Sequence, residues 1–154
     1  MRIGIGHVLR GFEPTRPLVL GGVKLMDGWG LRGKDDGDVL LLALCDAVLG
    51  AAGLGGRGDH MGEDPLPSAV LLSEVRVKAQ ARGFHIENVD ACIYAERLDV
   101  LPHRALMEER VAELLGIDPK AVNVKTDQAG GLGPVGEAKA VAAQAVVLLR
   151  EDVA

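Results

Sequence analysis

Aromatic residues are scarce in this chain of 154 residues, where Phe, Tyr and Trp together make up 3% of the sequence. Apolar residues still account for 48%, so a substantial core can form, but Leu, Val and Ala side chains must fill it. A chain of this length suits one compact domain. We therefore expect residues 1–154 to form a single domain.

Cysteine and basic residues are also limited. The two cysteines, Cys45 and Cys92, lie in apolar segments without a CxxC pair, which indicates buried free thiols and excludes a CxxC redox or zinc motif. The net charge of −5 argues against a nucleic-acid binder, which normally has a basic surface. No run reaches the roughly 18 apolar residues of a membrane span, and no signal-peptide pattern is visible. We expect a cytoplasmic protein that binds neither nucleic acid nor membrane.

The chain contains patterns of both strands and helices. A Gly21-Gly22 pair between two short apolar runs predicts a hairpin, and Asp38 is a good N-cap for an apolar helix. Glycines in the first strand suggest close approach of another backbone. The predicted strands cover 1–12, 16–20, 23–25, 85–98, 119–127 and 139–150, and the predicted helices cover 39–52, 69–81 and 102–116. This order favours an α/β (α+β) fold with a mixed β-sheet packed on helices.

Several segments, in this order, resemble the 2-C-methyl-D-erythritol 2,4-cyclodiphosphate synthase family. They are "MRIG", "LGGV", "DGDV" followed by "ALCDAVLGAAGLG", "NVDACI", "LPH" and "VNVKT". The resemblance implies a homotrimer with active sites between subunits and often an apolar cavity on the trimer axis. It also implies closure of a cyclic diphosphate with release of CMP, with a zinc ion on the substrate diphosphate and a second divalent cation between the phosphates.

The residues at the family's zinc positions differ in this chain. The family ends its first strand in Asp-x-His and has a further His in the buried helix, whereas Val8, Arg10 and Leu42 stand at those positions here. Val and Leu carry no donor atom, and a guanidinium repels a divalent cation. We therefore expect no zinc and no other cofactor at this location.

Substrate-facing positions differ as well. Lys34 and Asp35 stand where the family has His-Ser, and Asp127 replaces a threonine that binds the nucleotide phosphates. Lys125 is kept, and Leu101 belongs to the segment that lines the family's cytosine pocket. A carboxylate at Asp127 would repel an anionic phosphate. These differences lead us to expect that the family's reaction is lost.

The charged residues of the altered loops allow more than one interpretation. Lys34 and Asp35 form either an acid/base pair or solvated loop charges. His7 and Arg10 mark either a metal-free anion site or a filled pocket, in which Arg10 pairs with Asp35 or Asp36. Asp36 and Asp38 are shared with the family, where they shape the loop and start the helix. His60 is either a cleft residue or a surface histidine.

The expected function is a cleft between subunits that serves a different, metal-independent reaction or a small anionic or apolar metabolite. The alternatives are a non-catalytic trimer that binds a metabolite or partner, and an ordinary synthase with an altered metal site. In the first case the catalytic side chains would be Lys34, Asp35 and His60, and the binding side chains His7, Arg10, Asp36, Asp38, Glu63, Asp64, Leu101, Lys125 and Asp127.

Overall fold

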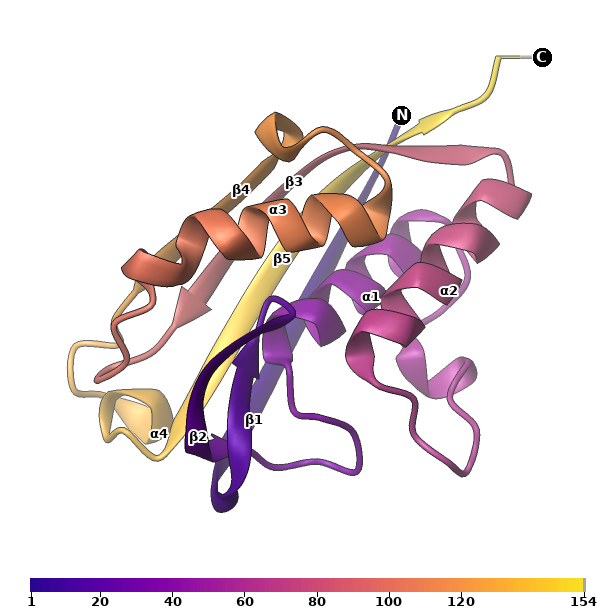
Figure 1. Cartoon of the computed structure of the whole chain (residues 1–154). Helices are drawn as coiled ribbons and strands as arrows, with labels where there is room; N and C mark the ends of the chain where they lie inside the picture. Colours follow the sequence, from indigo (N-terminus) through magenta and orange to yellow (C-terminus); the bar gives the residue numbers. More distant parts are fainter. Residues whose placement is uncertain (154) are drawn as a thin grey trace.

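A computed structural model describes residues 1–153 as a five-stranded mixed sheet with helices (Figure 1). The strands are β1 (Arg2–Leu20), β2 (Val23–Leu31), β3 (Phe84–Tyr94), β4 (Val122–Asp127) and β5 (Ala140–Glu151). Their spatial order is β2-β1-β5-β3-β4. Only β3 and β4 pair in parallel, and the other neighbours are antiparallel. The expected α/β fold with a mixed sheet is confirmed.

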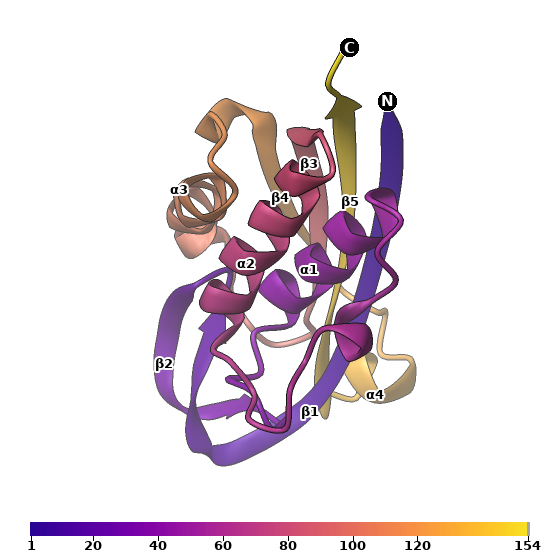
Figure 2. The same ribbon diagram turned by 90° about the vertical axis from the view of Figure 1, so that its right-hand side faces the viewer.

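Helices α1 (Val39–Ala51), α2 (Ser68–Ala81) and α3 (Arg104–Leu115) lie on one side of the sheet (Figure 2). The short α4 (Gly133–Gly136) precedes β5, and three 3₁₀ turns span Arg57–Asp59, Leu101–His103 and Pro119–Ala121. Helix α1 packs on β1 and β5 and against α2, while α3 packs on β4. In residues 1–153 no helix is both long enough and apolar enough to span a bilayer.

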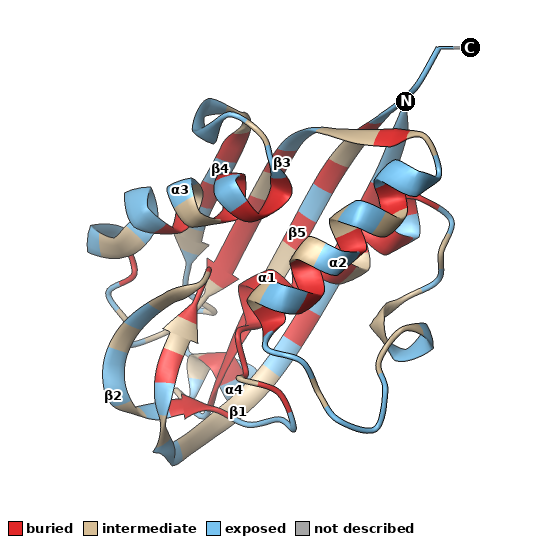
Figure 3. Cartoon of the chain, turned by 45° about the vertical axis from the view of Figure 1, so that its right-hand side comes forward, coloured by how far each residue is buried: buried red, intermediate tan, exposed pale blue. Residues whose placement is uncertain are grey.

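Helix α1 is the centre of the core and is buried on nearly every side (Figure 3). Leu40, Leu41, Leu42 and Leu44 have no exposed surface. A helix that is apolar all round is stable only when other elements enclose it, and here the sheet and α2 do so. The core consists mainly of Leu, Val and Ala, as the scarcity of aromatic residues predicts.

Two glycines let α1 approach β1 closely. A Cβ atom at Gly4 would lie 1.8 Å from the carbonyl oxygen of Ala47, and one at Gly6 would lie 1.8 Å from that of Ala43. No side chain fits into such a contact, because it would overlap the helix backbone. The predicted close approach at the first strand is confirmed, and it fixes the distance between sheet and helix.

The opposite face of the sheet carries no helix along β1. Successive side chains of a strand point to opposite faces, and Gly4, Gly6 and Val8 are buried whereas Ile3 and Ile5 are exposed. Ile5 pairs with Val146 on β5, which is exposed too. This chain therefore leaves an apolar strip of sheet uncovered.

Some predicted boundaries differ from the structure. The first two predicted strands are one long strand, β1, because its pairing with β2 shifts register between Glu13 and Val19 and so accommodates two prolines. The same pairing extends the strand predicted over 23–25 to Leu31. The segment between the strands predicted over 119–127 and 139–150 contains the short α4.

Substitution Gly6→Ala tests the close contact between β1 and α1. The added methyl group must displace the helix backbone, so we expect the free energy of unfolding in urea to fall by about 3 kcal/mol or more. Gly58→Ala is the matched control, because nothing lies within 4 Å of a Cβ at Gly58, and its effect should stay within about 1 kcal/mol. Equal effects of the two substitutions would contradict the proposed packing.

Candidate active site

Asp38 anchors the start of α1 to the β1–β2 turn. Its Oδ1 accepts hydrogen bonds from the backbone N–H groups of Gly21 (2.9 Å) and Leu41 (3.1 Å), and its Oδ2 accepts from Gly22 (2.7 Å). The predicted N-cap is therefore confirmed. Asp38 has no exposed surface. Burial raises its pKa to about 7, and the three backbone donors act in the opposite direction.

Asp36 ties the same loop to α2. One oxygen accepts from the N–H of Asp38 (3.3 Å), and the other accepts from both the N–H (3.1 Å) and the hydroxyl (2.9 Å) of Ser68. Pro67 occupies the cap position of α2, and Ser68 is the first helical residue. The hydroxyl of Ser68 thus donates to Asp36 in the loop and does not cap the helix.

Asp35 lies at the centre of this loop and is 7% exposed. Its Oδ1 accepts from the N–H of Gly37 (2.9 Å), and its Oδ2 lies 3.8 Å from a terminal nitrogen of Arg10. Arg16 donates to the backbone oxygens of Gly33 (2.8 Å) and Asp35, which holds the loop against β1. The loop therefore presents Asp35 as the ionic partner of Arg10.

Lys34 does not join this pair. Its side chain is exposed, and within residues 1–153 no ion pair links it to Asp35. The acid/base arrangement considered for Lys34 and Asp35 is thus not assembled in this conformation. The Arg10–Asp35 ion pair, one of the two pairings considered for a filled pocket at Arg10, is present.

The three positions that correspond to the family's zinc ligands do not fit a zinc ion. Val8 and Leu42 belong to the main apolar core, and neither has a donor atom. Arg10 is a cation, and its Nε is buried without a hydrogen-bond partner. In the part of the chain that the structure describes, no three His, Cys, Asp or Glu side chains gather closely enough to hold a metal.

Two of the predicted histidines lie apart from the Arg10–Asp35 pair. His7 is exposed on the helix-free face of β1, opposite Gln144, whereas Arg10 belongs to the alternate set of β1 positions. His60 donates from Nε2 to the carbonyl oxygen of Leu54 (2.7 Å), and its Nδ1 lies 3.2 Å from Nζ of Lys78. Both ring nitrogens of His60 are therefore engaged within the chain. Glu63 and Asp64 are exposed on the loop between the 3₁₀ turn and α2.

Asp46 is a polar residue of α1 that the sequence did not single out as a site residue. It follows Leu42 by four residues, so both lie on the same side of the helix. Its two oxygens accept from the backbone N–H (2.8 Å) and the Nε (3.0 Å) of Arg57, which fixes the loop after α1. An isolated Asp in an otherwise apolar helix was the available sequence signal.

A pocket of about 330 Å³ lies between the segment after β3 and the end of β4. Leu101, Thr126 and Asp127 line it, together with Ala95, Leu98, Asp99, Val100 and Gln128. Lys125 is not among the lining residues, since its Nζ donates to Asp90 at 2.6 Å. This hydrogen bond raises the pKa of Lys125. The pocket combines an apolar wall with backbone and carboxylate groups.

Comparisons with known proteins agree along the whole chain. The model of the YgbB family matches residues 1–150. The protein named 2-C-methyl-D-erythritol 2,4-cyclodiphosphate synthase of Moorella thermoacetica is 44% identical, over 97% of this chain and 94% of its own length. The synthase of Desulfosudis oleivorans is 43% identical, over 99% of this chain and 94% of its own length.

Solved structures of similar proteins have the same fold. The bifunctional IspDF of Campylobacter jejuni superimposes with a TM-score of 0.93 and 33% identity, over 98% of this chain and 42% of that one. IspF of Plasmodium falciparum, solved as a CDP complex, has a TM-score of 0.88 and 28% identity, over 99% of this chain and 97% of that one.

The prediction of a lost reaction and a repurposed cleft is wrong. Relatives 41–44% identical to this chain over nearly its whole length carry the synthase name. That prediction gave the replacements at single loop positions more weight than agreement along the whole chain. The expected resemblance to the cyclodiphosphate synthases is confirmed.

The pH dependence of stability tests the burial of Asp38. Its pKa rises from 3.8 to about 7 on folding, so between these values the folded chain binds more protons than the unfolded chain. The stabilising contribution of protonated Asp38 is complete below about pH 4 and lost as the pH rises through about 7, with a slope of at most about 1.4 kcal/mol per pH unit.

Asp38→Asn is the non-titrating control for this effect. We expect the free energy of unfolding of the unsubstituted chain, relative to the variant, to decrease as the pH rises from about 4 to about 7. The variant should also be less stable throughout, because an amide nitrogen cannot accept from Gly22. Parallel pH profiles, measured by urea unfolding, would show that Asp38 does not titrate in this range.

Proposed function

Because the chain belongs to the YgbB family, we propose that it catalyses the reaction for which its relatives are named, closure of a methylerythritol cyclodiphosphate with release of CMP. The observation that carries this proposal is the 44% identity to a named synthase over 97% of the chain. The fold supports it too, since the solved relatives superimpose over almost the whole chain.

We assign nucleotide binding to the 330 Å³ pocket at Leu101 and Thr126. Its apolar wall suits a flat pyrimidine ring, and the backbone groups beside it can pair with the ring's polar edge. The similar Plasmodium falciparum protein was solved with CDP, which supports a cytidine nucleotide as the ligand. Asp127 also lines the pocket and disfavours a phosphate beside it, so we expect the phosphates to lie on the side away from Asp127.

We assign the diphosphate contact to Arg10. Its guanidinium is a permanent cation, and Asp35 holds it from one side, with Oδ2 3.8 Å from a terminal nitrogen of Arg10. Asp35 acts as the positioning residue, because its other oxygen is fixed by Gly37. Lys34 is exposed on the same loop and adds a second cation near the substrate. The former ligand positions Val8 and Leu42 serve as core in this proposal, and zinc is not bound there.

We further propose that residues 1–154 form one domain that assembles into a homotrimer through the helix-free face of the sheet. Ile3, Ile5, Leu9 and Val146 are exposed there. Monomeric proteins rarely leave a contiguous apolar surface of this kind uncovered. The active site would then combine groups of neighbouring subunits, as the family resemblance implies.

Turnover and its dependence on Leu101 test the proposed function. The purified chain should release CMP from the cytidylyl-diphospho-methylerythritol substrate. Leu101→Asp places a carboxylate in the nucleotide pocket, so we expect KM to rise about tenfold. Leu106→Asp is the matched control, because Leu101 and Leu106 are 60% and 55% exposed and only Leu101 lines the pocket. Absence of CMP release by a folded chain would contradict the proposal.

Metal analysis tests the assignment of Val8, Arg10 and Leu42. The purified chain should contain far less than one zinc per chain. The combined variant Val8→Asp, Arg10→His, Leu42→His supplies three zinc-binding side chains and should gain about one zinc per chain by elemental analysis. Arg10→His alone is the control and should remain without zinc. Stoichiometric zinc in the unsubstituted chain would refute this assignment.

A further inference from the structure

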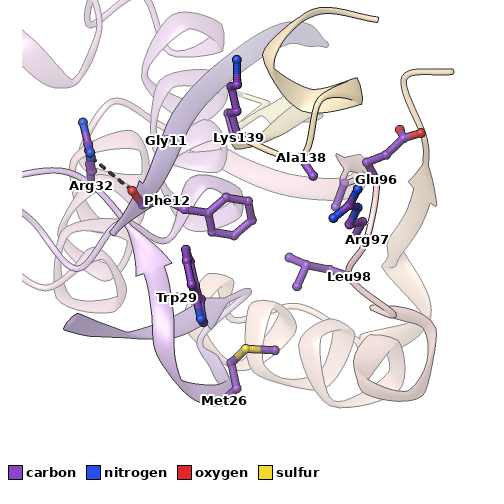
Figure 4. A pocket seen from close by; sticks show the side chains of 12 residues that line it. Gly11, Phe12, Met26, Trp29, Arg32, Glu96, Arg97, Leu98, Ala138 and Lys139 are labelled. Atoms are coloured by element: carbon purple, nitrogen blue, oxygen red, sulfur yellow. Dashed lines mark hydrogen bonds between the residues drawn. The ribbon is translucent and has the colours of Figure 1, made fainter. Parts of the chain in front are cut away.

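A large cavity lies next to the nucleotide pocket, with which it shares Ala95 and Leu98, and neither Arg10 nor Asp35 lines it. It has a volume of about 690 Å³ and lies between the β1–β2 hairpin, the segment after β3 and the segment before β5 (Figure 4). We call it the hairpin pocket and define it by Phe12, Met26, Trp29, Arg97, Leu98 and Ala138. Its volume falls within the range of pockets that bind small molecules.

The apolar wall of the hairpin pocket is an unusual concentration of large side chains for this chain. Phe12 and Trp29 meet edge to face, with ring centroids 6.4 Å apart and an interplanar angle of 79°. Trp29, the only tryptophan in the sequence, is 58% exposed. Figure 4 shows Met26 near Trp29 and Leu98 on the facing side of the pocket. An exposed indole face is a good surface for stacking of a flat apolar group.

The backbone around the pocket is strained. Among residues 1–153, only Trp29 (φ 52°) and Ala138 (φ 57°) are non-glycine residues with left-handed backbone, and both line the hairpin pocket. Residues with Cβ atoms disfavour this conformation, and such strain concentrates at ligand sites. At Trp29 it accompanies a break in the β1–β2 register and an indole that is presented outward.

The charge of the pocket is opposite to that of the chain. Three cationic side chains and one carboxylate line it, although the whole chain carries −5. Arg32 lies near Glu13 (3.8 Å) and Lys139 near Glu137 (2.7 Å). The pocket's carboxylate, Glu96, accepts from the backbone of Ala129 at 3.0 Å.

Arg97 is the cation of the pocket that remains available. It is exposed, and within the described part of the chain it forms no ion pair. An arginine without an internal partner can bind a carboxylate, phosphate or sulfonate through two parallel hydrogen bonds. The geometry therefore provides an apolar stacking surface at Trp29 and an anion-binding group at Arg97.

We propose that the hairpin pocket binds a small molecule with a flat apolar body and one anionic group. The body stacks on Trp29 between Phe12, Met26 and Leu98, and the anion pairs with Arg97. This site adjoins the proposed nucleotide pocket and shares Leu98 with it, but its stacking surface at Trp29 and its anion contact at Arg97 do not line that pocket.

Two fluorescent probes that differ in one anionic group test the proposal with the full chain. Anilinonaphthalenesulfonate carries the anion, and N-phenylnaphthylamine has a similar aromatic body without it. Because Trp29 is the only tryptophan, energy transfer from tryptophan to the probe reports binding near this residue. We expect energy transfer with the sulfonate probe, and an affinity for it about tenfold higher than for the neutral probe.

Variants at Arg97 separate the anion contact from general hydrophobic binding. Arg97→Gln should weaken the sulfonate probe about tenfold and leave the neutral probe unchanged, whereas Arg97→Lys should retain most of the affinity. Arg82→Gln is the control, since it removes the same charge from an exposed residue outside the pocket. Urea midpoints equal to that of the unsubstituted chain show that the variants fold.

Three results would overturn the proposal. The first is that the sulfonate probe binds the unsubstituted chain and Arg97→Gln with equal affinity. The second is that the unsubstituted chain binds both probes with equal affinity. The third is that no energy transfer from Trp29 is observed. The last result would arise if a neighbouring subunit filled the pocket, and it would then exclude a small-molecule site there.

Discussion

The buried carboxylate of Asp38 is the interaction on which the rest of the structure depends. It accepts hydrogen bonds from the N–H of Leu41 in the first turn of α1 and from both N–H groups of the Gly21-Gly22 turn. The turn joins β1 to β2, and the position of the helix start determines the direction in which α1 runs into the core. Asp35 and Asp36 precede it in the same loop and are held by Arg10 and Ser68. One short acidic segment thereby joins the sheet, α1 and α2.

Close packing of α1 against β1 explains the residues at the family's metal positions. Gly4 and Gly6 bring the helix backbone onto the strand, and Val8 and Leu42 continue this contact as apolar core. Replacing a buried polar ligand by a leucine removes the need for a polar partner and adds roughly 1.5–3 kcal/mol of burial. Arg10 lies further along β1, at the point where side chains regain access to solvent. The chain thus keeps the family's fold, but the charged side chain beyond the β1–α1 contact is Arg10.

Much of the fold could be predicted from local patterns. Asp38 before an apolar run and the Gly-Gly hairpin each depend on neighbouring residues, and the structure confirms them. The continuity of β1 through Pro14 and Pro17 could not be predicted, since it depends on register shifts against β2. The ion pair of Arg10 with Asp35 was one of several alternatives, because only the folded loop shows which carboxylate faces the strand.

The wrong prediction that the family's reaction is lost had a different origin. Single replacements such as Leu42 and Asp127 are informative about a ligand or a phosphate contact, but they do not reveal whether the reaction persists on an otherwise similar scaffold. Agreement with named synthases along the whole chain bears on that question more directly. The hairpin pocket, in turn, had no sequence signal, because its residues come from three separate segments of the chain.

We propose that this chain performs the synthase reaction with Arg10, instead of a zinc ligand, at the substrate diphosphate. The most direct measurement is the rate of CMP release in magnesium buffer with and without a zinc-selective chelator, for the unsubstituted chain and for Arg10→Met. The account predicts a rate that the chelator leaves unchanged and that Arg10→Met reduces by about tenfold or more. Loss of activity on chelation, with full activity of Arg10→Met, would contradict it.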